Sequence, residues 1–413
     1  MSKKGSLHEF SEGWKIVLTA MLGVAFSGTN ILLYSVGALA PELHDTFGWS
    51  HGAIQLGSLV SILVTLISLS IVSILSDRLG VRVVTLWSVV LASLCLFLHA
   101  FLPNQIIIFY LLVAITAFAC AGTLPLTWTK MVTLWFRERL GLALGLTLLG
   151  TGLGGALLKP LAAGLIAEFG WRGAYVGLAC IPLIIVLPLV LFWFRTPEKS
   201  GTIQSENQGG DGAGSFATIL TDWRFWVIAI AYLPIGFAVP GLITNMELVL
   251  GASGGSERVV VIAASLFGVF VIIGRIVGGY LLDRFNPSLV GATLILSLSI
   301  AFVILAGQNL SPTMIILAIA LAGFGTGVEF DVLSYLIDKI FGSALYNKAF
   351  GGALAVLYLG AAFGPFLFGR TYDANGNFDA VLIPTAIGVA VASIMVGCLY
   401  RSLHRHEAGV KHE

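Results

Sequence analysis

The stretch VVVIAASLFGVFVIIGRIVGGYLLDR, residues 259–284, decides the fold class of this chain. From Val259 to Leu282 it is apolar apart from one charge, Arg275, and it ends abruptly on an aspartate and an arginine. A hydrocarbon core about 30 Å thick is crossed by roughly 20 helical residues, each rising about 1.5 Å. The stretch therefore predicts a membrane-spanning helix that carries one buried cation.

The composition of the whole chain agrees with this class. Of its 413 residues, 57% are hydrophobic and only 10% are charged, and the mean hydropathy is +0.97, which indicates a polytopic membrane protein surrounded by a lipid bilayer. The net charge of +1 gives no reason to expect nucleic acid as a partner. The four cysteines stand singly in apolar runs, so we expect neither a metal site nor a disulfide framework, and no cofactor.

Apolar runs separated by short charged loops predict twelve membrane spans. A polar, Gly/Ser-rich segment, residues 196–221, divides them into two sets of six and predicts a flexible cytoplasmic linker. We therefore expect an all-α membrane protein of two six-helix bundles, residues 1–195 and 222–413. The predicted spans are residues 14–40, 52–76, 82–101, 105–129, 139–167, 172–194, 222–250, 257–282, 287–307, 312–337, 347–370 and 379–400.

The lysines and arginines predict the orientation of these spans. If both termini are cytoplasmic, most basic residues fall on the cytoplasmic side, and the other side carries only Arg172, Arg258 and Arg370. The positive-inside rule then predicts a multi-pass protein of the inner (plasma) membrane. Lys159 and Arg275 remain inside the membrane.

The two halves repeat each other in sequence. The segment SILSDR, residues 73–78, returns as GYLLDR, residues 279–284, at an offset of 206 residues. Pro160 returns as Pro365 at an offset of 205. Halves in parallel repeat are expected to rock around a site near the middle of the membrane.

Residues 73–82, SILSDRLGVR, resemble the loop signature of the major facilitator superfamily, G-x-x-x-D-R-x-G-x-R, with Ser73 in place of the first glycine. Three further stretches resemble bacterial monocarboxylate transporters and oxalate/formate antiporters of that superfamily. They are FGWS at residues 47–50, RLGLALG at residues 139–145 and GTGVEFD at residues 325–331. The resemblance implies the major facilitator fold and the transport of a small organic anion by alternating access, with protons as coupling ion.

The resemblance also assigns roles to charged residues. Arg275 stands where that family keeps its carboxylate-binding arginine on helix eight. Animal monocarboxylate carriers have an aspartate four residues earlier, where this chain has Val271. The two loop signatures are expected to hold helix ends together during gating, through Asp77 and Arg78 in the first half and Asp283 and Arg284 in the second.

The two membrane cations are the main candidates for a binding site. An arginine in mid-membrane costs about 2.5–3.5 kcal/mol on insertion scales, so Arg275 requires a compensating partner, such as an anionic substrate. Side chains on helices tilt toward the N-terminus, so Arg275 and Lys159 are both expected to point toward mid-membrane. Alternatively, Lys159 reaches the outer membrane surface or a carbonyl that Pro160 leaves free.

Further polar residues in the spans have two interpretations each. Glu329 and Asp331, near the inner end of helix ten, either carry protons and take part in gating or pair with Arg284. Polar and aromatic residues on helices one, four, seven and ten either line the substrate cavity or pack within the bundles. These residues are Asn30, Tyr34, Trp128, Asn245 and Tyr335.

We therefore predict a secondary active transporter, functional as a monomer, that takes up a mono-, di- or aromatic carboxylate with protons. The alternatives are a drug or metabolite exporter of the same superfamily, or an anion exchanger. Drug/proton antiporters usually have a G-P motif on helix five, where this chain has Lys159 and Pro160. No nucleophile–base set or nucleotide-binding loop is present in the sequence, so we expect no catalytic residues and neither an enzyme nor a primary pump.

Overall fold

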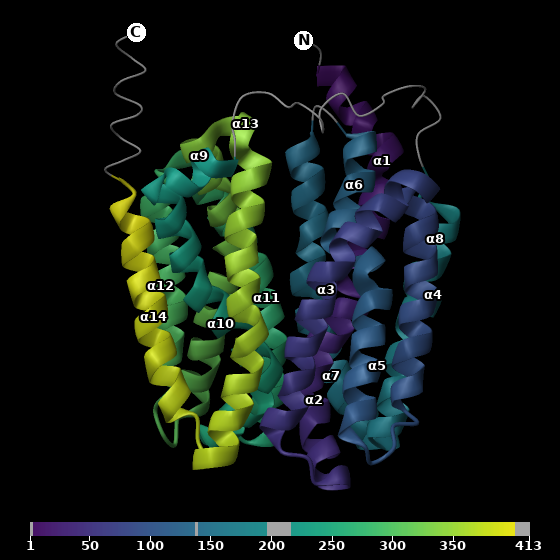
Figure 1. The fold of residues 1–413 in the computed structure, drawn as a ribbon, viewed down its shortest axis with the longest axis vertical. Coiled ribbons are helices and arrows are strands. Elements are labelled where there is room, and N and C mark those ends of the chain that lie inside the picture. The colour runs from purple at the N-terminus through teal and green to yellow at the C-terminus, as the bar shows by residue number, and fades with distance from the viewer. Residues whose placement is uncertain (1–2, 137–138, 196–215, 401–413) are drawn as a thin grey trace. The chain divides into compact units, whose positions relative to one another are not determined.

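The structure is a computed structural model that describes residues 3–136, 139–195 and 216–400. Every regular element in these ranges is a helix (Figure 1). Eleven helical stretches are long and apolar enough to cross a membrane. One of them, Leu140–Phe192, contains two spans joined at a kink, so the described residues hold the twelve predicted spans.

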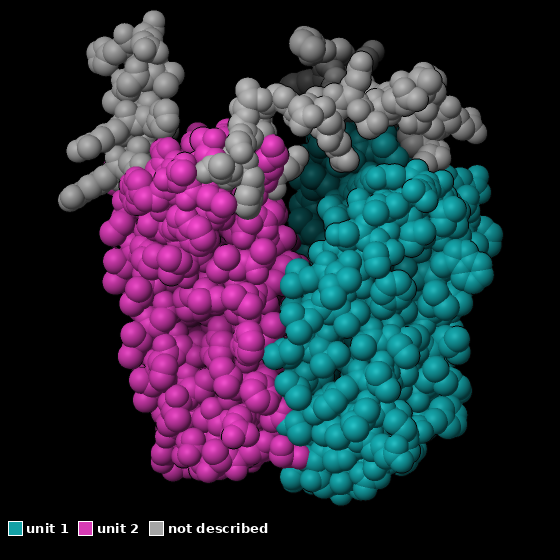
Figure 2. Space-filling model, in the orientation of Figure 1, with its two compact units in different colours: residues 1–49, 53–206 teal, residues 50–52, 207–413 magenta. Residues whose placement is uncertain are grey.

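The chain folds into two compact units, shown in Figure 2. Unit 1 comprises residues 1–49 and 53–206, and unit 2 comprises residues 50–52 and 207–413. The helices of unit 1 are α1 (Lys3–Ala25), α2 (Gly28–Phe47), α3 (His51–Leu79), α4 (Val81–His99), α5 (Ile106–Cys120), the 3-10 turn η1 (Ala121–Thr123), α6 (Pro125–Trp135), α7 (Leu140–Ile181), the π-helical turn η2 (Pro182–Val186) and α8 (Leu187–Phe192). Those of unit 2 are α9 (Phe216–Thr221), α10 (Trp223–Ala252), α11 (Glu257–Arg284), α12 (Pro287–Leu305), α13 (Pro312–Asn375) and α14 (Asp379–Cys398).

Helix α9 lies at the end of the segment that was predicted to be a linker. Its residues, Phe216–Thr221, are helical rather than irregular, and Asp222 then caps the start of α10 by accepting a hydrogen bond from the N–H of Arg224. The rest of the predicted linker, residues 196–215, lies outside the described residues.

The first span, predicted over residues 14–40, is present but contains a break between two helices. Helix α1 ends at Ala25, and α2 begins two residues after Phe26 with Ser27 as its N-cap. The hydroxyl of Ser27 accepts a hydrogen bond from the N–H of Asn30 (3.2 Å), and Asn30 Nδ2 donates to the carbonyl of Val24 (2.7 Å). Serine favours this cap because its short side chain satisfies a free N–H of the first turn.

Gly170 and Gly342 each separate two spans that would otherwise form one continuous helix. At about 1.5 Å per residue, straight helices of 42 and 64 residues would be about 63 and 96 Å long, far more than a bilayer is thick. Gly170 in α7 and Gly342 in α13 both have φ of 66°, a conformation that glycine adopts without a steric penalty. The chain turns at these points, so each long helix supplies two spans.

In unit 1, glycines of α7 allow that helix to touch the first span directly. A Cβ atom at Gly150 would lie 2.2 Å from the carbonyl oxygen of Met21, and one at Gly154 would lie 2.5 Å from that of Ala25. Such distances admit no side chain, so α7 packs on the backbone of α1. Gly150 and Gly154 therefore serve helix packing.

In unit 2, α10 and the second span of α13 form an even closer contact, which we call the α10–α13 seam. Cβ atoms at Gly360 and Gly364 would lie 2.2 Å from the carbonyl oxygens of Leu233 and Phe237. From the other side, a Cβ atom at Gly236 would lie 2.1 Å from the carbonyl oxygen of Leu357. Backbone therefore meets backbone along about two helical turns of the seam.

Candidate functional site

The helices that carry the charged residues of unit 2 are α11 and the first span of α13, and glycines hold them together. A Cβ atom at Gly274 would lie 2.3 Å from the carbonyl oxygen of Phe324. In the opposite direction, a Cβ atom at Gly327 would lie 2.2 Å from the carbonyl oxygen of Val271 and 2.9 Å from the amide nitrogen of Arg275. This close approach places Arg275 beside the residues of α13 that follow Gly327.

Arg275, Glu329 and Asp331 together form what we call the charge cluster. Nε of Arg275 lies 4.0 Å from Oδ2 of Asp331, and these two side chains are 10% and 25% exposed. Nine residues separate Arg275 from the end of α11 at Arg284, which is about 14 Å along the helix axis. Arg275 therefore lies near the middle of a hydrocarbon core that is about 30 Å thick.

Glu329 is the most deeply buried member of the charge cluster, with 6% of the residue exposed. Its Oε2 atom has no hydrogen-bond partner among the described residues. The carboxyl group is within electrostatic range of Arg275 and Asp331. Burying an ionised group is costly unless it is paired. Two carboxyl groups share one guanidinium here, so the cluster has one negative charge in excess when both are ionised.

The observed ion pair differs from the pairing that the sequence suggested. Asp331 lies beside Arg275, whereas the guanidinium of Arg284 lies over the ring of Tyr280, 4.2 Å from its centroid. One turn before Arg275 the helix has Val271, so the acidic partners of the arginine come from α13 rather than from its own helix. The α11–α13 contact made by the glycines is the reason for this arrangement.

The two loop signatures make matching contacts in the two units. Nζ of Lys130 lies 2.6 Å from Oδ1 of Asp77 in unit 1, and the hydroxyl of Tyr335 donates to Asp283 in unit 2. Asp77 and Asp283 are 206 residues apart, and Lys130 and Tyr335 are 205 apart, which are the offsets of the sequence repeat. Each aspartate of a loop signature therefore bonds to a residue in the fourth span of its own unit. These two partners, Lys130 and Tyr335, are at equivalent positions of the repeat. Arg78, the other signature residue of unit 1, is the last basic residue of α3.

Lys159 lies in unit 1, within the second half of the first span of α7. It is 2% exposed, so its side chain is almost wholly enclosed by the protein. Five residues earlier, Gly154 touches the carbonyl of Ala25, at the end of α1. Lys159 therefore follows the point where α7 crosses the break of the first span.

Three of the predicted cavity residues donate hydrogen bonds to backbone carbonyls. Asn30 bonds to the last turn of α1, as described above. Trp128 is fully buried, and its Nε1 donates to the carbonyl of Thr123 (2.9 Å), beside the break between α5 and α6. Asn245 is also fully buried, and its Nδ2 donates to the carbonyls of Gly241 (3.0 Å) and Pro365 (3.3 Å). Tyr34 is 4% exposed in α2, and Tyr335 bonds to the loop signature rather than lying at mid-span.

Two tyrosines that the sequence reasoning did not select lie beside the charge cluster. The hydroxyl of Tyr232, in α10, donates to the backbone carbonyl of Glu329 (2.8 Å). Tyr358, in the second span of α13, is within electrostatic range of the Glu329 carboxyl. Each is a phenol in an otherwise apolar run, which is the signal that could have identified them.

No group of three or more His, Cys, Asp or Glu side chains suited to a metal ion occurs in the described ranges. The four cysteines, all in described helices, are free thiols.

A model of the Major Facilitator Superfamily matches residues 17–365 and 254–412 of the chain. Among curated proteins, the Gentisate transporter of Corynebacterium glutamicum is 25% identical over 392 residues, covering 92% of this chain and 86% of that protein. The Benzoate transport protein of Acinetobacter baylyi is 22% identical, covering 92% and 89%. Monocarboxylate transporter 13 of Rattus norvegicus is 24% identical, covering 93% and 87%.

Solved structures resemble the fold of the chain along nearly its whole length. A bacterial homolog to the human lysosomal transporter Spinster, in an inward-facing and unoccupied conformation, matches with a TM-score of 0.71 and 17% identity, covering 94% of this chain and 97% of the other. The nucleoside transporter NupG matches with a TM-score of 0.70 and 16% identity, covering 95% and 98%. At such identities the likeness shows the fold alone, and it is a fold of two six-helix bundles.

Proposed function

Because the chain belongs to the major facilitator superfamily, and is a transporter rather than an enzyme, we propose that it carries an organic carboxylate anion together with protons by alternating access. The observation that carries this proposal is the position of Arg275. It is a guanidinium enclosed at mid-span, with two carboxyl groups of α13 beside it.

Arg275 is suited to bind the carboxylate of a substrate. A guanidinium presents a planar fork of N–H groups that matches a carboxylate in a bidentate pair, with N···O distances of about 2.7–2.9 Å. The 4.0 Å separation between Arg275 and Asp331 is longer than such a contact. A substrate carboxylate can therefore make a closer pair with the guanidinium than Asp331 does.

The acids named for three relatives support this substrate class. Their names assign gentisate, benzoate and monocarboxylates to those proteins. Two of the three are aromatic acids, so aromatic monocarboxylates are the first substrates to test on this chain.

The charges around Arg275 support proton coupling. With Glu329 and Asp331 ionised, the charge cluster is already one negative charge in excess, and a bound carboxylate would add another in a site of low dielectric. A proton taken up by Glu329 removes this second charge. The unpartnered Oε2 of Glu329 supports the role of a proton acceptor for this residue.

Further residues complete the proposed cycle. Lys159 would provide a second cation to a dicarboxylate, with Asn30, Tyr34, Trp128 and Asn245 as candidates for further substrate contacts. The contacts of Asp77 with Lys130 and of Asp283 with Tyr335 would hold helix ends together in one state of the cycle.

The distribution of Lys and Arg supports an inner-membrane location with both termini in the cytoplasm, and we propose that a single chain suffices for transport.

Uptake into proteoliposomes tests this proposal. The purified chain is reconstituted, and accumulation of radiolabelled benzoate, gentisate, a short aliphatic acid and a dicarboxylate is measured with and without an acidic exterior. The variants are Arg275→Lys and Arg275→Ala, and the matched control is Arg258→Lys, which changes an exposed arginine of the same helix. We expect at least one acid to accumulate only with the pH gradient.

The variants identify the binding group. Arg275→Ala should abolish uptake and Arg275→Lys should reduce it at least about tenfold, because an ammonium cannot form the bidentate pair. The control should transport as the native chain does. Normal uptake by a correctly inserted Arg275→Ala protein would refute the role of Arg275, and counterflow without any response to pH would instead identify an anion exchanger.

A further inference from the structure

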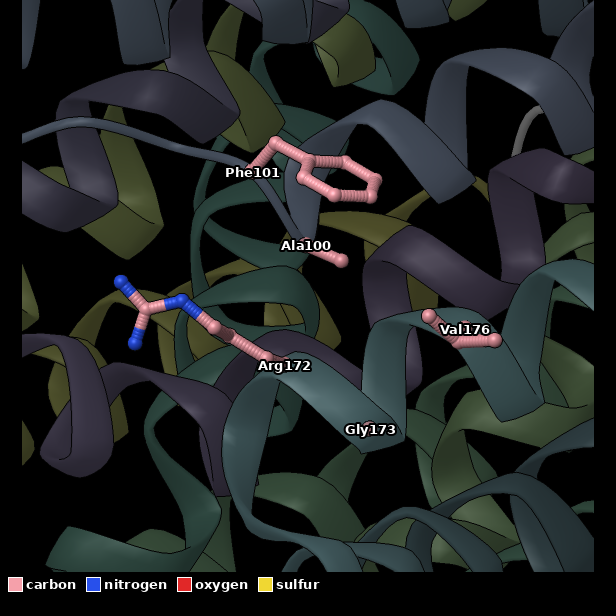
Figure 3. Close-up of a pocket in the computed structure, with 5 residues that line it drawn as sticks. All are labelled: Ala100, Phe101, Arg172, Gly173 and Val176. Atoms are coloured by element: carbon pink, nitrogen blue, oxygen red, sulfur yellow. The ribbon is translucent and has the colours of Figure 1, made fainter.

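A groove in unit 1 lies at the membrane boundary, far from the charge cluster in sequence. It has a volume of about 480 Å³ and is lined by Ala100, Phe101, Arg172, Gly173 and Val176. In Figure 3, Ala100 and Phe101, just after α4, lie across from the helix of Arg172, Gly173 and Val176, and the side chain of Arg172 extends to the side opposite Val176. The span of α4 ends at His99 and the second span of α7 begins after Gly170, so the groove lies where both spans end.

The walls of this groove are held in place by contacts beneath it. The rings of His99 and Tyr175 stack with centroids 5.0 Å apart, and both residues are buried. Nε1 of Trp171 donates to the hydroxyl of Thr46 (3.0 Å). Each of these buried residues directly precedes a lining residue in the sequence, so these contacts support the backbone of the groove.

The lining is amphipathic in composition. Arg172 is its only charged residue, and the other four residues are small or apolar. The guanidinium lies over the ring of Trp171, 4.1 Å from its centroid, which leaves its N–H edges available. Within the described ranges, no carboxylate forms an ion pair with Arg172.

Large aromatic side chains beside the groove are exposed. Phe101 is 66% exposed and Phe169, which touches Gly173, is 69% exposed. Phe97 packs edge-on against Phe101, with centroids 5.2 Å apart. Large exposed rings at the end of a membrane span are in contact with acyl chains, and an arginine at the same level meets the lipid headgroups.

We propose that this groove binds one anionic phospholipid. The guanidinium of Arg172 would pair with the phosphodiester, and Phe101, Val176 and Ala100 would contact the glycerol and the first methylenes of an acyl chain. A groove of about 480 Å³ has room for this part of a lipid. A zwitterionic lipid fits less well, because the lining contains no carboxylate for its choline or ammonium group.

Lipid retention by the purified full-length chain tests this proposal. The chain in detergent is titrated with dioleoyl phosphatidylglycerol or dioleoyl phosphatidylcholine, and bound lipid is counted by native mass spectrometry beside the thermal unfolding midpoint. The variants are Arg172→Gln, which removes the charge, and Val176→Trp, which fills the groove and keeps the charge. The control is Arg258→Gln, which removes an exposed arginine elsewhere.

We expect one phosphatidylglycerol per chain to be retained by the native protein and by the control, with a raised unfolding midpoint. Both groove variants should bind it about tenfold more weakly, because a charge-assisted contact or its space is lost. Equal retention of both lipids, or unchanged binding by Arg172→Gln, would overturn the proposal. Displacement of the lipid by millimolar inorganic phosphate would also overturn it, since the groove would then be a general anion site.

Discussion

At the scale of single residues, Glu329→Gln should separate substrate binding from proton movement. The amide keeps the size of the carboxyl but does not take up a proton, so accumulation driven by a pH gradient should fall at least about tenfold. Exchange of labelled for unlabelled acid should continue. The measurement is uptake and counterflow by the same proteoliposomes, with Glu257→Gln, an exposed position on α11, as control. Undiminished gradient-driven accumulation would exclude Glu329 as the proton acceptor.

Lys159→Ala should penalise dicarboxylates more than monocarboxylates. Only a dicarboxylate loses a second ion pair with this buried cation, and the loss should weaken its transport by roughly ten- to a hundredfold. Because both acids are measured on one protein, a general loss of folded carrier cancels in their ratio. An equal and small effect on both classes would indicate that Lys159 serves the structure alone. Lys339→Ala, an exposed lysine, provides the control.

The sequence identified the cation of the charge cluster but not its partner. A lone charge in an apolar span is visible in the sequence, which is why Arg275 could be selected. The position of Asp331 beside it depends on how closely α11 and α13 approach, and that distance is set by Gly274 and Gly327 in the folded structure. One interpretation of the sequence paired Glu329 and Asp331 with Arg284 of the loop signature, yet the guanidinium of Arg284 stacks on Tyr280 instead.

At the scale of helices, Gly327→Ala should disrupt the charge cluster without touching a charge. The added methyl group would lie 2.2 Å from the carbonyl oxygen of Val271, so α11 and α13 must separate. Overpacking of this kind costs about 1–3 kcal/mol of stability, and it should also lower transport by displacing Arg275 from Asp331. Gly351→Ala is the matched control on α13, because no atom lies within 4 Å of its added methyl group. The measurements are the thermal unfolding midpoint and the uptake rate of both variants, and both should fall for Gly327→Ala only.

Tyr335→Phe and Asp283→Asn should slow turnover and leave substrate affinity nearly unchanged. Tyr335→Phe removes the hydrogen bond at the end of α11, far from mid-span, and Asp283→Asn weakens it by removing the charge of the acceptor. Since both act on one contact, the double variant should be no slower than the slower single variant. The measurement is the rate of exchange together with substrate binding at equilibrium. A large loss of affinity in either single variant would show that the contact supports the binding site instead.

The helix breaks show which local features a sequence pattern misses. Hydropathy indicated a continuous span through residues 14–40, because Ser27 and its neighbours interrupt the apolar run only briefly. The break becomes visible through hydrogen bonds that Ser27 and Asn30 make to backbone, which depend on conformation. Trp128 was a candidate for the cavity on its chemistry, and the bond of its indole to Thr123 is likewise a consequence of the break in span four.

At the scale of the whole molecule, the chain should tolerate division between Glu206 and Asn207, where residues 53–206 of unit 1 end and residues 207–413 of unit 2 begin. Each unit has its own buried core, so residues 1–206 and 207–413 expressed together should insert separately and restore part of the native uptake. Either fragment alone should give none. Uptake by cells that express both fragments is the measurement, with a division inside α12 as the negative control. Complete inactivity of two correctly inserted fragments would contradict the independence of the units.

The number and type of the spans could be predicted at this scale because the bilayer fixes their length and polarity. The sequence repeat also predicted that equivalent residues of the two units would play similar roles. Asp77 and Asp283 both contact the fourth span of their own unit, and their partners are separated by the offset of the repeat. The repeat did not predict the distribution of charge. The guanidinium and both carboxyls of the charge cluster belong to unit 2, and Lys159 belongs to unit 1. Substrate chemistry can differ between halves that share one fold.

The α10–α13 seam limits how this transporter can diverge over generations. A clash between two side chains can be relieved by a second mutation that shortens the partner. At Gly236, Gly360 and Gly364 the nearest atom is a backbone carbonyl oxygen. Because every amino acid has this oxygen, no substitution of the partner residue can relieve the clash. We therefore expect a genetic selection for suppressors of Gly364→Ala to recover true revertants or distant changes, and none at Phe237.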